Sequence, residues 1–64
     1  MDLYTLATEK AKALVEAQAA SAEYRCVIRL SRSQHIIDRY ARACSRACDT
    51  AARLEDRYRA AVAA

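Results

Sequence analysis

The sequence predicts an all-α fold, a two-helix antiparallel hairpin with helices at about residues 2–30 and 33–63. Three observations support this. The 64 residues contain neither glycine nor proline, and the tight turns of sheet folds draw heavily on those two residues. Alanine and arginine, both good helix formers, are abundant. Apolar residues also recur at alternating spacings of three and four, which is the period of one helix face.

The second helix carries the clearer pattern. Its apolar residues follow a strict alternation of three and four, and arginines and aspartates fill the opposite face. These apolar positions correspond to a and d of a heptad, so we expect them to form the seam with the first helix. The predicted interface residues here are Ile37, Tyr40, Cys44, Ala47, Ala51, Leu54 and Tyr58.

The first helix repeats the pattern more loosely. Its stripe includes Lys10, whose aliphatic stem can lie along apolar surface while the ammonium group stays in water. The predicted interface residues of this helix are Leu3, Leu14, Tyr24 and Ile28. A second apolar line flanks the stripe and widens it, through Leu6, Ala13, Ala20 and Val27.

The two stripes do not join into one face. Ile28 and Ile37 are nine residues apart, a rotation of about 180° at 3.6 residues per turn. A break between them solves this, and Ser31 with Gln34 fits a capping box, while Ser33 is an alternative N-cap. Because no glycine is present to end the first helix, one long continuous helix remains the alternative.

The chain is expected to form a single helical-hairpin domain over residues 1–64. A domain this small buries only about 60% of the surface that its unfolded chain exposes. A two-helix hairpin buries one stripe of each helix, so we expect oligomerisation to complete a helical bundle, either a dimeric four-helix bundle or a larger array. The sequence shows no recognisable signal peptide and no apolar run of the roughly 20 residues that a membrane span needs.

The three cysteines differ in their predicted positions. Cys44 lies at a seam position and Cys48 beside it, where free cysteine behaves as a small buried hydrophobe. If the turn centres near residue 32, Cys44 lies level with about residue 21. Cys26 falls at an outward position of the first helix. Either another subunit covers Cys26, or its thiol forms an intermolecular disulfide that joins subunits of an assembly.

No catalytic, cofactor-binding or metal-binding residues are predicted. A structural zinc site needs four ligands, and the cysteines lie too far apart along the hairpin to supply them. His35 falls near the turn without a second histidine or a carboxylate pair on its face. No glycine-rich phosphate loop is present, so we do not expect an enzyme.

Positive charge gathers near the predicted turn, where few carboxylates balance it. A hairpin would collect these side chains into a basic tip, which could bind nucleic-acid phosphates or an acidic protein surface. Aromatic side chains for base stacking are missing there. The candidate contacts at this tip are Arg25, Arg29, Arg32 and Arg39.

Two functions are therefore expected from the sequence. The first is a non-enzymatic structural module that packs into a larger homo- or hetero-oligomer, such as a phage particle or a filament. The second is a dimeric four-helix-bundle regulator that binds RNA or DNA through the basic tip. The expected partners are proteins, through self-association or a larger assembly. The expected location is the cytoplasm or a virion-like particle.

Overall fold

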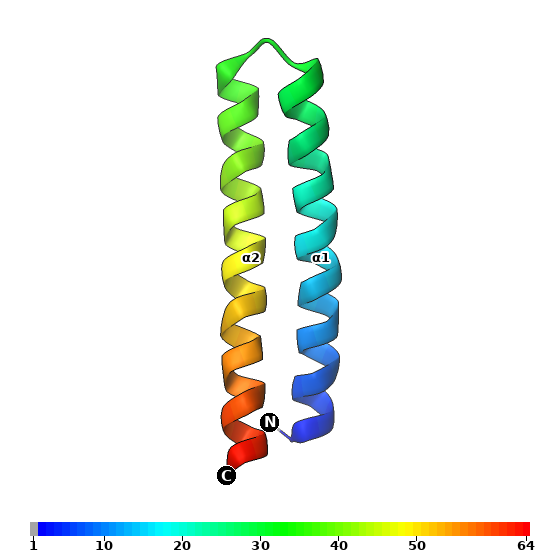
Figure 1. The fold of residues 1–64 in the computed structure, drawn as a ribbon, viewed down its shortest axis with the longest axis vertical. Coiled ribbons are helices and arrows are strands. Elements are labelled where there is room, and N and C mark those ends of the chain that lie inside the picture. The colour runs from blue at the N-terminus through cyan, green and yellow to red at the C-terminus, as the bar shows by residue number, and fades with distance from the viewer. Residues whose placement is uncertain (1) are drawn as a thin grey trace.

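A computed structural model describes residues 2–64 and contains two helices joined by a short turn (Figure 1). Helix α1 runs over Leu3–Leu30 and helix α2 over Gln34–Ala63. The helices lie antiparallel along their whole length, and the hairpin measures 48 × 14 × 13 Å. The all-α hairpin is confirmed, and the alternative of one continuous helix is wrong, because the chain leaves helical geometry at residues 31–33.

Serine side chains and extended backbone make the turn without glycine. Ser31 ends α1 in an extended conformation, and its N–H donates to the Val27 carbonyl at 2.8 Å. Ser33 is the N-cap of α2 and accepts from the Ile36 N–H at 3.5 Å. Of the two predicted caps, Ser33 is therefore the one used. No residue in the described range has a positive φ, so the turn needs none of the left-handed conformations that favour glycine.

The start of α1 is capped by an acidic side chain. Asp2 is the N-cap, and its Oδ1 accepts the Thr5 N–H at 2.7 Å. This hydrogen bond, together with the positive end of the helix dipole, favours the charged carboxylate. The pKa of Asp2 is accordingly lowered from its ordinary value, chiefly by the backbone hydrogen bond from Thr5.

The seam between the helices is narrow, and its middle is built from small residues. Within residues 2–64 only Leu6, Ala13 and Ala17 are buried, each about 6% exposed, and all three belong to α1. No residue of α2 is fully buried. Alanine lets the helix axes approach closely, at the lower end of the usual 8–10 Å. It also buries little apolar area per residue, at about 25 cal/mol per Å².

The register of α2 agrees with the heptad pattern. All of its predicted seam residues are partly buried against α1, namely Ile37, Tyr40, Cys44, Ala47, Ala51, Leu54 and Tyr58. The hydrophobic pattern of this helix is sharp, so the sequence admits one register only.

The register of α1 differs from the predicted one. Leu3, Leu14 and Ile28 were expected on the seam, but they are 47%, 50% and 47% exposed. The seam instead follows the line that was expected to flank it, with Leu6 and Ala13 as its buried members. The physical reason is that α1 is apolar on more than one side, so its pattern admits two neighbouring registers. Tyr24 is partly buried, as expected.

The position of the seam can be tested with two leucines of α1. Leu6→Ala removes a buried side chain and is expected to lower the free energy of unfolding by about 2 kcal/mol or more. Leu30→Ala removes a side chain that is 79% exposed, and is expected to change it by less than about 0.5 kcal/mol. Urea unfolding followed by circular dichroism measures both. Equal effects of the two substitutions would contradict the seam described above.

Candidate interaction surface

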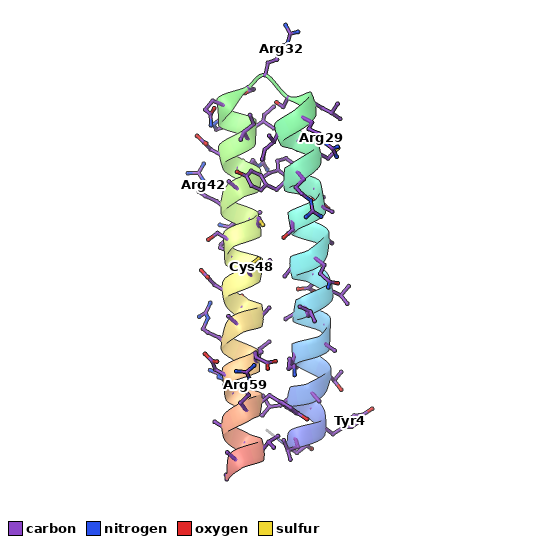
Figure 2. The ribbon with its side chains drawn as sticks, in the orientation of Figure 1. Tyr4, Arg29, Arg32, Arg42, Cys48 and Arg59 are labelled. Carbon is purple, nitrogen blue, oxygen red and sulfur yellow. The ribbon has the colours of Figure 1, made fainter. Side chains whose placement is uncertain are left out.

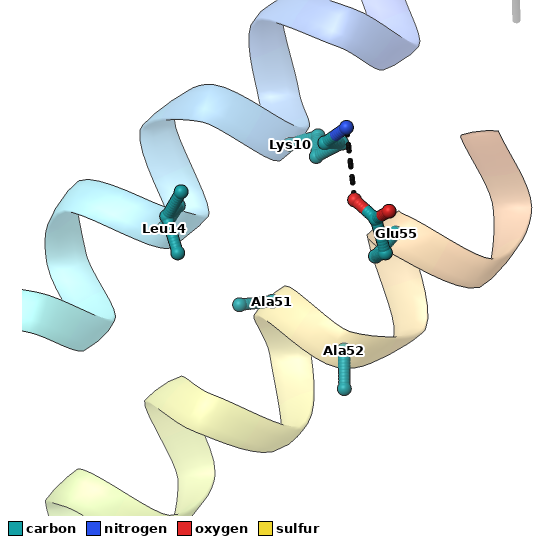
Figure 3. A pocket seen from close by; sticks show the side chains of 5 residues that line it. All are labelled: Lys10, Leu14, Ala51, Ala52 and Glu55. Carbon is teal, nitrogen blue, oxygen red and sulfur yellow. Dashed lines mark ion pairs between the residues drawn. The ribbon is translucent and has the colours of Figure 1, made fainter. Parts of the chain in front are cut away.

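A lysine inside the seam is held by partners on α2. Nζ of Lys10 lies 2.8 Å from Oε2 of Glu55 (Figure 3). The same Nζ lies 4.4 Å from the centre of the Tyr58 ring. Nε of Arg59 donates to the other oxygen of Glu55 at 2.8 Å. The ammonium group thus gains an ion pair and a cation–π contact. Lys10 therefore contributes a specific bridge between the helices near their open end.

Two cationic side chains, Lys10 and Arg59, contact Glu55 and lower its pKa. The hydrogen bond from Lys10 is the main cause that lowers the pKa of Glu55 below its ordinary value of 4.5, and Arg59 adds to the effect. Partial burial opposes this shift, because desolvation disfavours the charged carboxylate. The folded hairpin therefore favours ionised Glu55.

One side of the hairpin carries a row of shallow hollows, and we call it the groove face. Near the open end, Lys10 and Leu14 of α1 line one hollow with Ala51, Ala52 and Glu55 of α2 (Figure 3). Further along, a second hollow lies between α1 and Cys48, and a third lies beside Ile28 at the turn end. The groove face is defined by Leu14, Gln18, Ser21, Arg25 and Ile28 of α1 with Cys48, Ala52 and Glu55 of α2.

The other side of the seam is charged on both helices, and we call it the charged face. On α1 it presents three exposed glutamates at intervals of seven residues, and on α2 it presents exposed arginines. Arg53 and Arg57 share a hollow there with Thr50 and Leu54, apart from the hollows of the groove face. The charged face is defined by Glu9, Glu16, Glu23, Arg46, Arg53 and Arg57. Such a face is suited to remain in water.

The cysteines take three different environments. Cys44 is partly buried, and its Sγ lies 3.4 Å from Oγ of Ser21, which confirms the expected level of these two residues in the hairpin. Cys48 is exposed on the groove face, near the middle of α2 (Figure 2). Cys26 is exposed, as its outward position predicted. All three are free thiols in the single chain.

The four arginines of the predicted basic tip all lie toward the turn end, and all are exposed. Arg32 lies in the turn itself and extends beyond the ends of the helices, while Arg29 points away from the seam (Figure 2). Arg25 borders hollows of the groove face. Arg39 lies on α2, on a turn of helix that also carries Asp38. The hairpin therefore gathers the four residues at one end but spreads them around it.

Two features of this surface were missed by sequence reasoning. The Lys10–Glu55 bridge had a signal, because a lysine at a seam position calls for a carboxylate at the same level of the partner helix. The groove face also had a signal in the sequence, but a weaker signal. The apolar stripe of α1 divides: Lys10 and Tyr24 lie in the seam together with the flanking line, whereas Leu14 and Ile28 lie on the groove face.

Metal sites and membrane-spanning helices are not found within residues 2–64. No three histidine, cysteine or acidic side chains in this range come close enough to hold a metal ion. Neither helix contains a stretch apolar enough to cross a membrane.

Comparisons with known proteins were made for the whole chain. No protein family model, curated protein or solved structure matches it.

The Lys10–Glu55 bridge predicts a specific dependence of stability on pH. Because the pKa of Glu55 is lowered in the folded chain, its contribution is present above the ordinary value of 4.5 and is lost as the pH falls through the lower folded value. We expect Glu55→Gln to reduce the free energy of unfolding near neutral pH, and the difference from the wild type to shrink below about pH 4.5. Urea unfolding across this range measures it.

Glu9→Gln is the matched control, because Glu9 is an exposed glutamate on the charged face. It is expected to have a smaller effect near neutral pH. A Glu55→Gln effect that stays constant from neutral to acid pH would show that the bridge does not stabilise the hairpin electrostatically.

Proposed function

We propose that this chain is a non-enzymatic structural module that associates with further protein chains, in the first place with copies of itself. The larger unit would be a homo- or hetero-oligomer such as a particle or a filament, located in the cytoplasm or within a virion-like particle. The partner is protein, and the module requires no cofactor. What the hairpin offers to such an assembly is apolar surface on helices that are already formed.

The observation that carries this proposal is the large exposed area of the hairpin. The accessible surface is 5025 Å², whereas a compact monomer of 7.1 kDa is expected to expose about 4,100 Å². The excess is roughly 900 Å², close to the 800 Å² or so that each partner contributes to a standard protein interface. Within residues 2–64, eight large apolar side chains are at least 42% exposed, so an interface could bury apolar surface.

Cys26 supports a covalent version of the same assembly. Its thiol is exposed, so a second chain can reach it without unfolding either hairpin. A disulfide between two Cys26 thiols would persist in an oxidising environment, such as the outside of a cell, and would be reduced in the cytosol. The cysteine would therefore link subunits only after the assembly leaves a reducing compartment.

A second candidate function is the binding of RNA or DNA at the turn end. The supporting observation is charge, because the half of the hairpin nearest the turn, residues 17–48, contains six arginines and only two carboxylates. Phosphate contacts of this kind weaken steeply with salt. Binding of a short duplex that falls with rising salt and is lost in Arg29→Glu would favour this candidate, and absence of binding at low salt would remove it.

The assembly proposal predicts the native mass of the protein. Sedimentation of reduced protein at micromolar concentration is expected to give a dimer or a larger species, since the exposed apolar area would be buried between chains. Without reductant, we expect a covalent dimer on electrophoresis that Cys26→Ser removes and Cys44→Ser retains. A mass of 7.1 kDa at every concentration tested would overturn self-association.

A further inference from the structure

Resting on the proposed self-association, we propose that the groove face binds the groove face of a second copy of this chain in an antiparallel orientation. The two turns would lie at opposite ends of the resulting four-helix bundle. A two-fold axis would pass through the level of Cys48. The charged face of each hairpin would remain in water on the outside. The two Cys26 residues of such a bundle would lie about 27 Å apart along it, at 1.5 Å per residue, so a Cys26 disulfide would join one bundle to the next.

The middle of the groove face has the composition of a helix contact. Over the middle of the hairpin, its outward positions are Ala11, Leu14, Gln18 and Ser21 on α1, and on α2 they are Ala41, Ser45, Cys48, Ala52 and Glu55. Of these nine residues only Glu55 is charged, and its carboxylate is paired with Lys10 and Arg59. Six of the nine are alanine, serine or cysteine. Small residues let a second pair of helices approach closely. At the same levels the charged face carries glutamates and arginines instead.

Leu14 is an exposed apolar side chain on this face, and a complex with a partner that buries it would be stabilised. It is half exposed and lines two of the hollows. Two further large apolar side chains lie on the same side toward the two ends of the hairpin, namely Ile28 and Val62, which are 47% and 57% exposed. An apolar side chain that becomes fully buried contributes about 1.5–3 kcal/mol, so covering this face is favourable.

Two contacts within the hairpin fix the levels of the helices. Lys10 meets Glu55, and Ser21 meets Cys44. In an antiparallel hairpin, residues at the same level have residue numbers with the same sum, and both pairs agree on that sum. By this rule Ala17 lies level with Cys48, and these two residues line one hollow. This level is the midpoint of both helices. A two-fold axis placed there superimposes the full length of one hairpin on the other.

On α2, the outermost row of side chains on the groove face is complementary to the same row of a second copy that runs in the opposite direction. The row consists of Asp38, Ser45, Ala52 and Arg59, each seven residues from the next. It therefore presents a negative charge, two small residues and a positive charge. In an antiparallel pair, Asp38 of each copy lies level with Arg59 of the other, and small residues face small residues between them. Arg59 has further N–H donors besides the one that bonds Glu55.

The overall charge of the hairpin selects the same orientation. The turn half, residues 17–48, carries a net charge of +4, from six arginines and two carboxylates. The open half carries −1, from five cations and six carboxylates, which together gives the total of +3. Antiparallel copies place each positive half beside the other copy's negative half. Parallel copies would place the two positive halves together, which is unfavourable at moderate salt.

A matched pair of arginine substitutions tests the face. Ala52→Arg places a charge in the centre of the groove face, and Ala19→Arg places one on α1, away from that face. Both alanines are exposed in the hairpin, and each has a carboxylate three residues before it and four after it. The two variants are therefore equally favourable to their own helices. We expect Ala52→Arg to weaken dimerisation at least 100-fold, as measured by sedimentation equilibrium, and Ala19→Arg to leave it unchanged.

A distance measurement tests the orientation. Spin labels are attached to Arg32→Cys in a chain in which the three native cysteines, all free thiols, are replaced by serine. In the antiparallel dimer the two turns are separated by about the 48 Å length of the hairpin, and in a parallel dimer they are neighbours. A separation near 45 Å, at 1.5 Å per residue, supports the proposal, and one below about 20 Å overturns it.

The outcomes separate this inference from the proposed function. A wild-type dimer that Ala52→Arg does not weaken, or that Ala19→Arg weakens equally, overturns the groove-face contact but leaves self-association standing. A wild-type chain that stays monomeric overturns both. Circular dichroism of each variant confirms that the hairpin remains helical, and a variant that has lost its helices is replaced by Gln18→Arg on the same face.

Discussion

The structure depends on how little apolar surface two straight helices can bury against each other. Each helix of a hairpin covers one stripe of the other, and here the middle of the α1 stripe is alanine, at Ala13, Ala17 and Ala20. Within the described residues 2–64 only three side chains become buried. Small seam residues bring the axes close together, but they contribute little free energy per contact. The specific bridge of Lys10 with Glu55 and Tyr58 fixes the alignment of the helices, and it cannot replace a hydrophobic core.

The same constraint accounts for the two apolar sides of α1. A helix that packs against a single neighbour needs one stripe, as α2 has. α1 has a seam line that contains Leu6 and Ala13 and a second line that contains Leu14 and Ile28, and the second line is exposed in the single chain. A helix that is apolar on several sides is typical of a buried position in a larger bundle. The charged face gives the complementary signal, because its glutamates and arginines are suited to solvent.

Much of the fold could be predicted from the sequence, and the part that could not has a physical cause. The hairpin, the turn near residue 32, the Ser33 cap and the register of α2 follow from helix propensity, capping and a sharp period. The register of α1 could not be decided, because Lys10 and Ala17 fit either of two neighbouring stripes. The groove face was missed for the same reason: it becomes visible only when the structure shows which of the two stripes α2 covers. The basic tip was predicted as one cluster, but its arginines spread around the end of the hairpin.

The central proposal is that association with further copies adds to the stability of the hairpin. The most direct measurement is the urea midpoint of unfolding as a function of protein concentration, followed by circular dichroism under reducing conditions. If folding is coupled to dimer formation, the midpoint rises steadily with concentration, because association stabilises the folded state by mass action. A midpoint that stays the same over a thousandfold range of concentration (about 4 kcal/mol of chemical potential) would show that the two helices are stable alone, and it would contradict the account.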